Sequence, residues 1–162
     1  METNKMNIYL IGQITSDPET YEWRRRIRKR FEEHEKFRFF DPCNNMFSKS
    51  VLKSSKGNVE SFKSLAAWNT FSSILVPRDM SFVLSSDGAI VNLNLYTKDK
   101  PLLGTFFELA WLKINPEKTV IGIFDGDPKE NFICQHPFVK STVHAWVKND
   151  SQACDLLEEF FN

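Results

Sequence analysis

The chain has 162 residues, about the length of one domain. Its 21 Lys and Arg residues balance its 21 Asp and Glu residues, so the formal net charge is zero. Binding to a polyanion normally requires an excess of positive charge, so nucleic acid is disfavoured as the main partner. The apolar fraction of 41%, which includes fifteen Phe and four Trp, is sufficient for a hydrophobic core and argues against a disordered chain.

The sequence lacks the signals of several classes of protein and of several kinds of site. No apolar run approaches the ~18 residues that cross a bilayer, and residues 1–6 lack the features of a signal peptide. We therefore expect a cytoplasmic protein with no membrane partner. An odd number of cysteines without a close pair indicates free, packing thiols: Cys43, Cys134 and Cys154. The histidines have no second ligand at metal-binding spacing, so we expect no metal: His34, His136 and His144. Neither GxxxxGK[ST] nor GxGxxG occurs, and no cofactor is expected.

The first forty residues predict two strands with a helix between them. The apolar run 8–11, closed by Gly12, predicts a buried strand. Capping signals at 16–19 then precede apolar side chains that recur every four residues: Trp23, Ile27 and Phe31. The arginines that flank this stripe, at 24–26 and 28–30, are followed by glutamates, so we expect a solvated face in preference to a nucleic-acid surface. Residues 37–41 predict the second strand.

Further along, the polar stretch 44–60 predicts a long loop of the kind that often covers a site. A weak helical pattern covers 59–75, and a short helix is predicted at 79–85. The remaining elements alternate between strands and helices: strand 89–93, helix 103–114, strand 119–124, strand 142–147 and helix 151–161. This alternation predicts one α/β domain over residues 1–162, a flavodoxin-like or Rossmann-like parallel sheet of about five strands flanked by helices.

In such a sheet, ligands bind outside the carboxyl ends of the strands. The candidate segments are therefore those that follow the strands: 12–15, Asp41, 92–96 and 125–127.

Two acidic residues attract separate attention. Glu108 follows Gly104 and Thr105 at a predicted helix start. A Thr105/Glu108 capping box is one explanation of this pattern. The other is a carboxylate that the helix N-terminus keeps ionised and that acts as a nucleophile. Asp87 directly precedes the third predicted strand, and alone it would be a turn aspartate.

Four segments in order resemble the nucleoside 2-deoxyribosyltransferase family, including its relatives that hydrolyse the N-glycosidic bond of nucleotides. They are NIYLIGQIT at the start, WRRRIRKRF in the first helix, RDMSFVLSSDGAIVNL, in which Asp79 and Asp87 lie eight residues apart, and PLLGTFFELAWL, which is similar to the family's Gly-Thr-x-x-Glu segment. The resemblance covers nearly the whole chain. The segment QHPFV around His136 is a weaker similarity.

The resemblance implies a retaining double displacement. Glu108 would attack the anomeric carbon of a 2-deoxyribose, and Asp87 would assist proton transfer to the departing base, with the two carboxyl groups ~5 Å apart. The matching positions imply a base pocket formed by Tyr9, Gly12, Gln13 and Ile14, and substrate contacts from Gly104 and Thr105. Asn92 and Asn94 either contact the sugar or base or cap a strand end. The aromatic side chains of Phe106 and Phe107 are expected to keep water from the reactive sugar ester.

The implied partners are a nucleoside, or a nucleotide, and a free nucleobase, in nucleotide salvage. A homo-oligomer is also implied, in which the 125–137 segment of a partner chain helps to close the site. Two departures favour a free nucleoside over a 5′-phosphate: Leu102 stands where the family commonly has a polar residue, and Thr15 where nucleotide-hydrolysing relatives have an arginine. If the substrate were phosphorylated, Arg24 or a neighbouring subunit would have to supply the missing phosphate contact. Gln13 replaces the family's usual proline or serine and leaves the base preference open.

Three functions stay open at this point. The first is transfer of the deoxyribosyl group to a second base, and the second is hydrolysis of the same bond. The third is a non-catalytic nucleoside or nucleotide sensor on the same fold, which the departures at Leu102 and Gln13 suggest. Docking of nucleic acid on the basic helix is a weaker alternative.

Overall fold

The computed structural model describes residues 5–15, 17–44 and 67–161. Its centre is a parallel five-stranded sheet of order β2-β1-β3-β4-β5. The strands are β1 (Met6–Gly12), β2 (Phe37–Phe40), β3 (Gly88–Asn92), β4 (Thr119–Ile123) and β5 (Ala145–Val147). The predicted α/β fold is therefore confirmed. In this strand order the connections reverse direction between β1 and β3, so the crevice outside the ends of these two strands is the expected ligand position.

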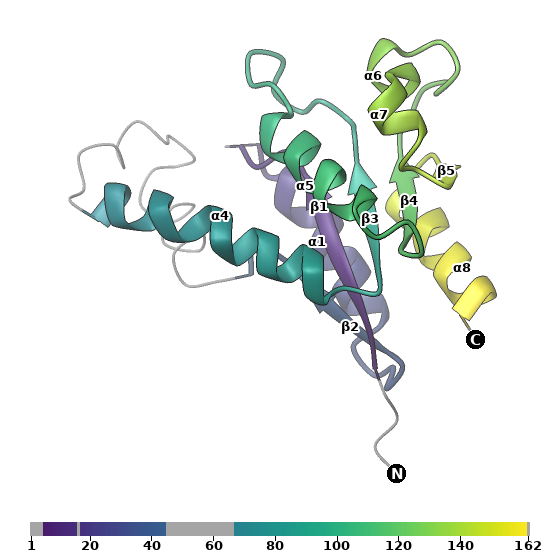
Figure 1. Cartoon of the computed structure of the whole chain (residues 1–162). Coiled ribbons are helices and arrows are strands. Elements are labelled where there is room, and N and C mark those ends of the chain that lie inside the picture. Colours follow the sequence, from purple (N-terminus) through teal and green to yellow (C-terminus); the bar gives the residue numbers. More distant parts are fainter. Residues whose placement is uncertain (1–4, 16, 45–66, 162) are drawn as a thin grey trace.

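Helices cover both faces of the sheet (Figure 1). The helices are α1 (Glu19–Arg30), α4 (Ala67–Ser85), α5 (Leu103–Lys113), α6 (Phe132–Gln135), α7 (Pro137–Lys140) and α8 (Asp150–Phe161). Side chains of α1 and α8 pack with Ile8, Leu10 and Ile90 on one face of the sheet. Side chains of α4, α5 and the short α6 and α7 pack with Tyr9 and Val91 on the other face. Consecutive strand residues thus alternate between two cores, as the pleat of a strand requires.

The prediction was wrong about the helix that precedes β3. We expected a short helix at 79–85, but α4 is continuous through Pro77 and is 19 residues long. Proline removes one N–H from a helix and normally marks a boundary. Here Val83, near the end of α4, is fully buried in the core, and Phe82 packs against it. Tertiary packing therefore prevails over the local signal. Residues 45–60 of the predicted loop 44–60, and the first part of the predicted helix 59–75, lie outside the described residues.

The short helices α6 and α7 were also missed. Asn131 caps α6, because its side-chain oxygen accepts hydrogen bonds from the backbone N–H groups of Ile133 and Cys134 at 2.9 and 3.1 Å. Pro137 begins α7, a position where its missing N–H is tolerated. Each helix has four residues, too few to show a helical period in the sequence.

Arg24 does not belong to the solvated face that we expected for the basic residues of α1. It is fully buried and donates to the carbonyl oxygens of Leu10, Gly12, Gln13 and Thr20. Arg25, Arg26 and Arg30 do lie at the surface, where they pair with acidic side chains. Arg26 and Arg30 reach across to α8, so these charges stabilise helix packing and are not a free basic patch.

All three cysteines are buried with free thiols. Cys134 and Cys154 belong to the two opposite cores, and burial raises the pKa of each thiol, to about 11 for Cys134 and about 12 for Cys154. They pack as small apolar side chains, as predicted. Within the described part of the chain, no helix combines the length and the apolar character needed to span a membrane.

Candidate functional site

Glu108 lies on α5 and faces the sheet. Its carboxyl group is buried, with 8% of the residue exposed, and it accepts a hydrogen bond from the hydroxyl of Tyr9 in β1. The predicted capping box does not form. The helix begins at Leu103, its N-cap Leu102 makes no side-chain cap bond, and its first turn contains no acidic residue. Glu108 is therefore in the second turn, on the core-facing side of the helix.

The environment of Glu108 raises the pKa of its carboxyl group to about 7. Burial is the main cause, because the charged form loses solvation. The Tyr9 hydroxyl opposes this shift, since its hydrogen bond favours the carboxylate, whereas the nearby Asp79 adds to the shift. The expectation of a glutamate kept ionised by the helix N-terminus was wrong. The side chain instead changes its protonation state near neutral pH, the property of a residue suited to acid–base or nucleophilic work.

Glu108 lines a pocket of about 230 Å³ between α4 and α5. A second carboxylate, Asp79 of α4, lines the same pocket. The other walls are apolar or aromatic: Leu75, Val76, Gly104, Phe107 and Trp111. Two acidic groups in an otherwise apolar recess favour a flat or weakly polar ligand that presents one or two polar atoms.

Asp79 is held by its neighbour on α4. Both Nε and Nη2 of Arg78 donate to one carboxylate oxygen of Asp79, Oδ1, at 2.8 and 2.7 Å. Burial raises the pKa of the Asp79 carboxyl group, and the guanidinium lowers it in part. Each of the two carboxylates in the pocket therefore has its own hydrogen-bond donor, Tyr9 for Glu108 and Arg78 for Asp79.

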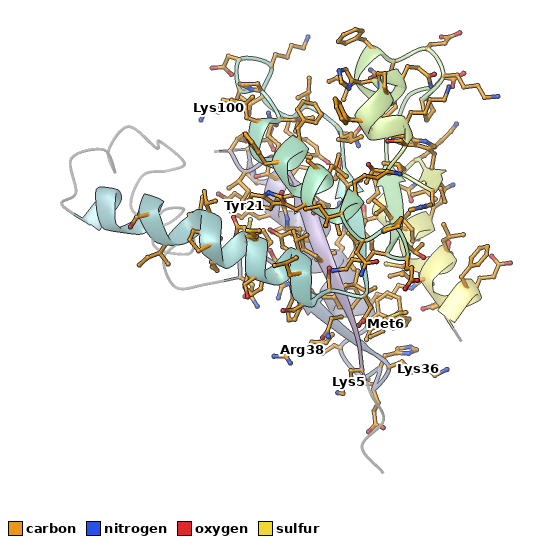
Figure 2. All side chains as sticks on the ribbon, in the orientation of Figure 1. Lys5, Met6, Tyr21, Lys36, Arg38 and Lys100 are labelled. Carbon is orange, nitrogen blue, oxygen red and sulfur yellow. The ribbon has the colours of Figure 1, made fainter. Side chains whose placement is uncertain are left out.

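Asp87 does not line this pocket, so the structure does not bring it together with Glu108 as the resemblance implied. It is exposed and lies directly before β3, where its carboxylate accepts a bond of 2.7 Å from the backbone N–H of Asn7. Strand register places this point at the amino end of the sheet. Figure 2 shows Lys5 and Lys36 at that end of the molecule and Lys100 at the opposite end. The turn before β3 explains Asp87 completely.

Gln13 fills the crevice at the end of β1. Its amide nitrogen donates to the carbonyl oxygens of Thr97 and Lys100 at 2.9 and 2.6 Å. Its amide oxygen accepts from the backbone N–H groups of Tyr96 and Thr97, both at 3.0 Å. With both ends of the amide engaged, Gln13 binds the protein's own loop 96–100 and not a base. The crevice at the reversal between β1 and β3 is thus occupied by the chain itself.

The predicted contacts Asn92 and Asn94 also stabilise loops. Asn92 donates to the Tyr96 hydroxyl at 2.9 Å and accepts from the backbone N–H of Asn94 at 3.1 Å. Asn94 accepts from the backbone N–H of Asp125 at 3.0 Å. Of the two expectations for this pair, the strand-end cap is the one that the structure supports. Both residues also line a separate pocket of about 540 Å³, of mixed polar and apolar character, over the ends of β3 and β4.

Of the other predicted site residues, some belong to the pocket of Glu108 and the rest do not line it. Tyr9 and Gly104 belong to the candidate site, through the bond to Glu108 and the pocket lining. Gly12 is a close-packing position, because a Cβ there would lie 3.0 Å from the Asn92 carbonyl oxygen. Thr105 is buried in α5, and Ile14 is 47% exposed. Neither residue lines this pocket, so a base pocket made of β1 end residues is not what the structure forms.

Leu102 and Thr15, at the two positions where the family binds a 5′-hydroxyl or 5′-phosphate, provide no cation and no free hydrogen-bond donor to the pocket. Leu102 is 3% exposed and packs in the core. The hydroxyl of Thr15 accepts hydrogen bonds from the backbone N–H of Asp17 and from the Thr97 hydroxyl, at 3.1 and 3.0 Å. Arg24, the expected substitute, is committed to backbone carbonyls. Phe107 lines the pocket as expected, whereas Phe106 lies on a neighbouring apolar groove between α5 and α7.

Sequence reasoning missed Asp79, Arg78 and Trp111 as site residues. A signal was present: Asp79 lies four residues before the apolar Val83, on the same face of a predicted helix. A carboxylate on the face that contacts the core is unusual and points to a function. In the described part of the chain, no group of His, Cys, Asp and Glu side chains is arranged to hold a metal ion.

Comparison with known proteins supports the fold only. No protein-family model matches the chain, and no curated protein matches it. Among solved structures, a conserved protein from Enterococcus faecalis V583 superposes with a TM-score of 0.59 and 14% sequence identity, over 96% of this chain and 98% of that chain. The chain therefore shares its fold with that solved protein, at an identity too low to transfer an activity.

Proposed function

We propose that the protein cleaves the N-glycosidic bond of 2′-deoxynucleosides through a covalent glycosyl-enzyme on Glu108 and transfers the deoxyribosyl group to another nucleobase. The observation that carries the proposal is the pocket in which Glu108, bonded to Tyr9, lies with a second carboxylate, Asp79. Two carboxylates serve this chemistry, one as nucleophile and one as proton donor. The sequence segments that resemble the deoxyribosyltransferase family support Glu108 as the nucleophile, whereas Asp79 takes the proton-transfer role that the resemblance gave to Asp87.

In the first step, ionised Glu108 attacks the anomeric carbon of the sugar. A carbon–oxygen ester bond forms, and the carbon–nitrogen bond breaks with its electron pair leaving on the base. Asp79 gives its proton to that base, so that a neutral base departs. In the second step, a nitrogen of another base attacks the same carbon, Glu108 leaves as a carboxylate, and Asp79 takes the proton that the new base loses. Two inversions return the original configuration.

Tyr9 has a defined part in this scheme. Its hydroxyl donates to Oε1 of Glu108, which stabilises the carboxylate and leaves Oε2 as the attacking atom. Burial keeps water from solvating the carboxylate in the pocket, so the charge that develops there is balanced by fixed groups and not by solvent.

The charges around the pocket favour an uncharged nucleoside over a nucleotide. The pocket holds two acidic side chains, which repel a phosphate. The nearby cations are already engaged, Arg24 by backbone carbonyls and Arg78 by Asp79. Phe107 and Trp111 supply aromatic walls suited to a flat base.

The test is incubation of the protein with each 2′-deoxynucleoside, with and without a second free base, followed by separation of the products. We expect a new nucleoside when the second base is present. The variant Glu108→Gln should abolish base release, whereas Glu117→Gln, at an exposed position, should not. Acid quenching should trap a protein whose mass is increased by one deoxyribosyl group, located on the peptide that contains Glu108. Base release at the wild-type rate by Glu108→Gln contradicts the assignment.

The same experiment separates the alternatives. Free deoxyribose without a new nucleoside indicates a hydrolase. Ligand binding without any base release indicates a sensor, for which the buried Leu102 and the engaged Gln13 are the supporting observations.

A homo-oligomer in the cytoplasm is part of the proposal. Large aromatic side chains lie on the surface near the pocket, with Phe107 62%, Phe132 83% and Phe138 74% exposed. Burial of such side chains against a second copy would stabilise an assembly by roughly 25 cal/mol for each Å² removed from water. Phe132 belongs to the 125–137 segment expected to reach a partner's site. Light scattering at several protein concentrations tests the assembly.

A further inference from the structure

The Arg78–Asp79 pair is asymmetric. Both donors of the guanidinium bind the same oxygen of Asp79, Oδ1. Among the hydrogen bonds that the structure describes, Oδ2 receives none. Because a carboxyl group is planar, a fixed Oδ1 also fixes the direction of Oδ2.

The guanidinium is itself held in place by an aromatic stack. It lies over the ring of Phe82, one turn further along α4, at 5.8 Å from the ring centre. Phe82 stacks on Phe40 of β2 at 5.2 Å and contacts Tyr9 of β1 at 5.9 Å. Arg78 is therefore packed between Asp79 and an aromatic cluster that also contacts the hydrogen-bond partner of Glu108.

We infer that Arg78 is a positioning residue, which binds Oδ1 of Asp79 and thereby presents Oδ2 to the substrate as the atom that gives and takes the proton. This inference rests on the proposed function. It adds a residue that neither the sequence motifs nor the resemblance indicates, and it explains why a charged side chain lies half-buried beside an acidic pocket.

Asp79 acts on titratable groups of three other segments, because its charge raises the pKa of Glu108 on α5, of Tyr9 on β1 and of Cys43 after β2. Arg78, on the same helix, is the charged group that acts on Asp79 itself. Within the described residues, Arg78 is the cation bonded to Asp79. Its guanidinium opposes the effect of burial and so makes the protonated carboxyl group a stronger acid.

Lysine is not an equal substitute, because an ammonium group is a point charge on a flexible stem and lacks the planar fork that fixes one oxygen with two bonds. Arg78→Lys should therefore retain part of the electrostatic effect and lose the orientation. Arg78→Met should lose both.

The test uses ¹³C-labelled aspartate in the full chain and NMR titration of the Asp79 carboxyl signal, assigned by its loss in Asp79→Asn. We expect the pKa of Asp79 to rise by roughly one unit or more in Arg78→Met and by less in Arg78→Lys. Arg25→Met, at an exposed arginine of α1, is the matched control and should leave the signal in place. If Arg78→Met does not fold, Arg78→Gln takes its place in the same titration.

Activity supplies the second measurement. Arg78→Met should lower kcat at least tenfold for nucleosides with poor leaving bases, change KM less than about threefold, and recover in part in Arg78→Lys. An unchanged Asp79 pKa in Arg78→Met, or a shifted pKa with unchanged kcat, overturns the inference. Absence of base release by the wild-type protein would instead reject the proposed function, and the titration would still report whether Arg78 controls Asp79.

Discussion

Asp79 and Glu108 line one pocket from two neighbouring helices, and each carboxylate accepts a hydrogen bond from a different residue. Tyr9, which binds Glu108, comes from the sheet, whereas Arg78, which binds Asp79, comes from α4. The two acidic groups therefore have separate hydrogen-bond partners, although the charge of Asp79 raises the pKa of Glu108. Such a pair is suited to a reaction in which one carboxylate attacks and the other exchanges a proton.

Replacement of Tyr9 by Phe should shift the pH dependence of activity to higher pH. The hydroxyl favours ionised Glu108, so its loss raises the pKa of that carboxyl group above its present value of about 7. Since the attacking form is the carboxylate, the ascending limb of kcat/KM against pH should move upward, and activity at pH 7 should fall by roughly tenfold. Tyr21→Phe, which alters a tyrosine of α1, is the control. A limb that stays in place in Tyr9→Phe contradicts the role of the hydroxyl.

Asp79→Asn should lower the rate of base release much more than Asp87→Asn. Loss of a general acid typically costs on the order of 10²–10⁴ in rate, and we expect this for Asp79→Asn with nucleosides whose base must be protonated to leave. Asp87→Asn should stay within about twofold of wild type, because an asparagine oxygen still accepts the bond from Asn7. Steady-state measurement of kcat for both variants shows which of the two aspartates is the general acid. A large loss in Asp87→Asn alone would restore the prediction made from the sequence.

Glu108→Gln should be more stable than wild type at alkaline pH. The folded-state pKa of Glu108 is raised from 4.5 to about 7, so the folded state binds this proton more tightly than the unfolded state. Stability of the wild type therefore decreases as pH rises through the interval between these values and stays low above it. Glutamine does not ionise, so the variant loses no stability in this pH range from a buried charge at this position. We expect a difference on the order of 1–3 kcal/mol at pH 8 and a much smaller one at pH 4, from urea unfolding at both values.

Arg24→Met should destabilise the fold strongly, whereas Arg25→Met should not. Arg24 is buried, donates to four backbone carbonyls, and has its Nε 3.9 Å from Oδ1 of Asp41. Removing it takes the guanidinium donors from these carbonyls and one of two cations from the buried Asp41, which Arg28 still contacts at 3.0 Å, and we expect a cost of about 1–3 kcal/mol for each buried group left without a donor. Arg25 pairs with Glu22 in solvent, where the cost is below about 1 kcal/mol. Equal midpoints of urea unfolding for the two variants would show that Arg24 is not a structural charge.

The fold could be predicted because its signals are local. Short apolar runs ending at residues such as Gly12, and an apolar side chain every four residues in α1, specify strands and helices without knowledge of the rest of the chain. Pro77 is the exception, since the packing of Val83 that keeps α4 helical involves the sheet.

The site was predictable only in part, because its contacts are long-range. Glu108 was found from the Gly-Thr-x-x-Glu segment, but its partners Tyr9 and Asp79 depend on how α4 and α5 pack on β1. Asp87 received its proton-transfer role from the family resemblance, and its position before a strand does not by itself show that it lies at the amino end of the sheet, away from Glu108. Gln13 has the donors and acceptors of a ligand contact, and only the return of the loop 96–100 shows that they are used internally.

The four hydrogen bonds of Gln13 also bear on the route that a nucleoside would take under the proposed function. They fasten the loop 96–100 over the end of β1, so opening the molecule there would break all four at once. Among the described residues, the pocket of Glu108 lies between α4 and α5, and two of the side chains that line it, Val76 and Phe107, are exposed. Under the proposed function, a nucleoside would enter and leave between α4 and α5. The side chains that line this opening would then affect the order in which bases bind and leave.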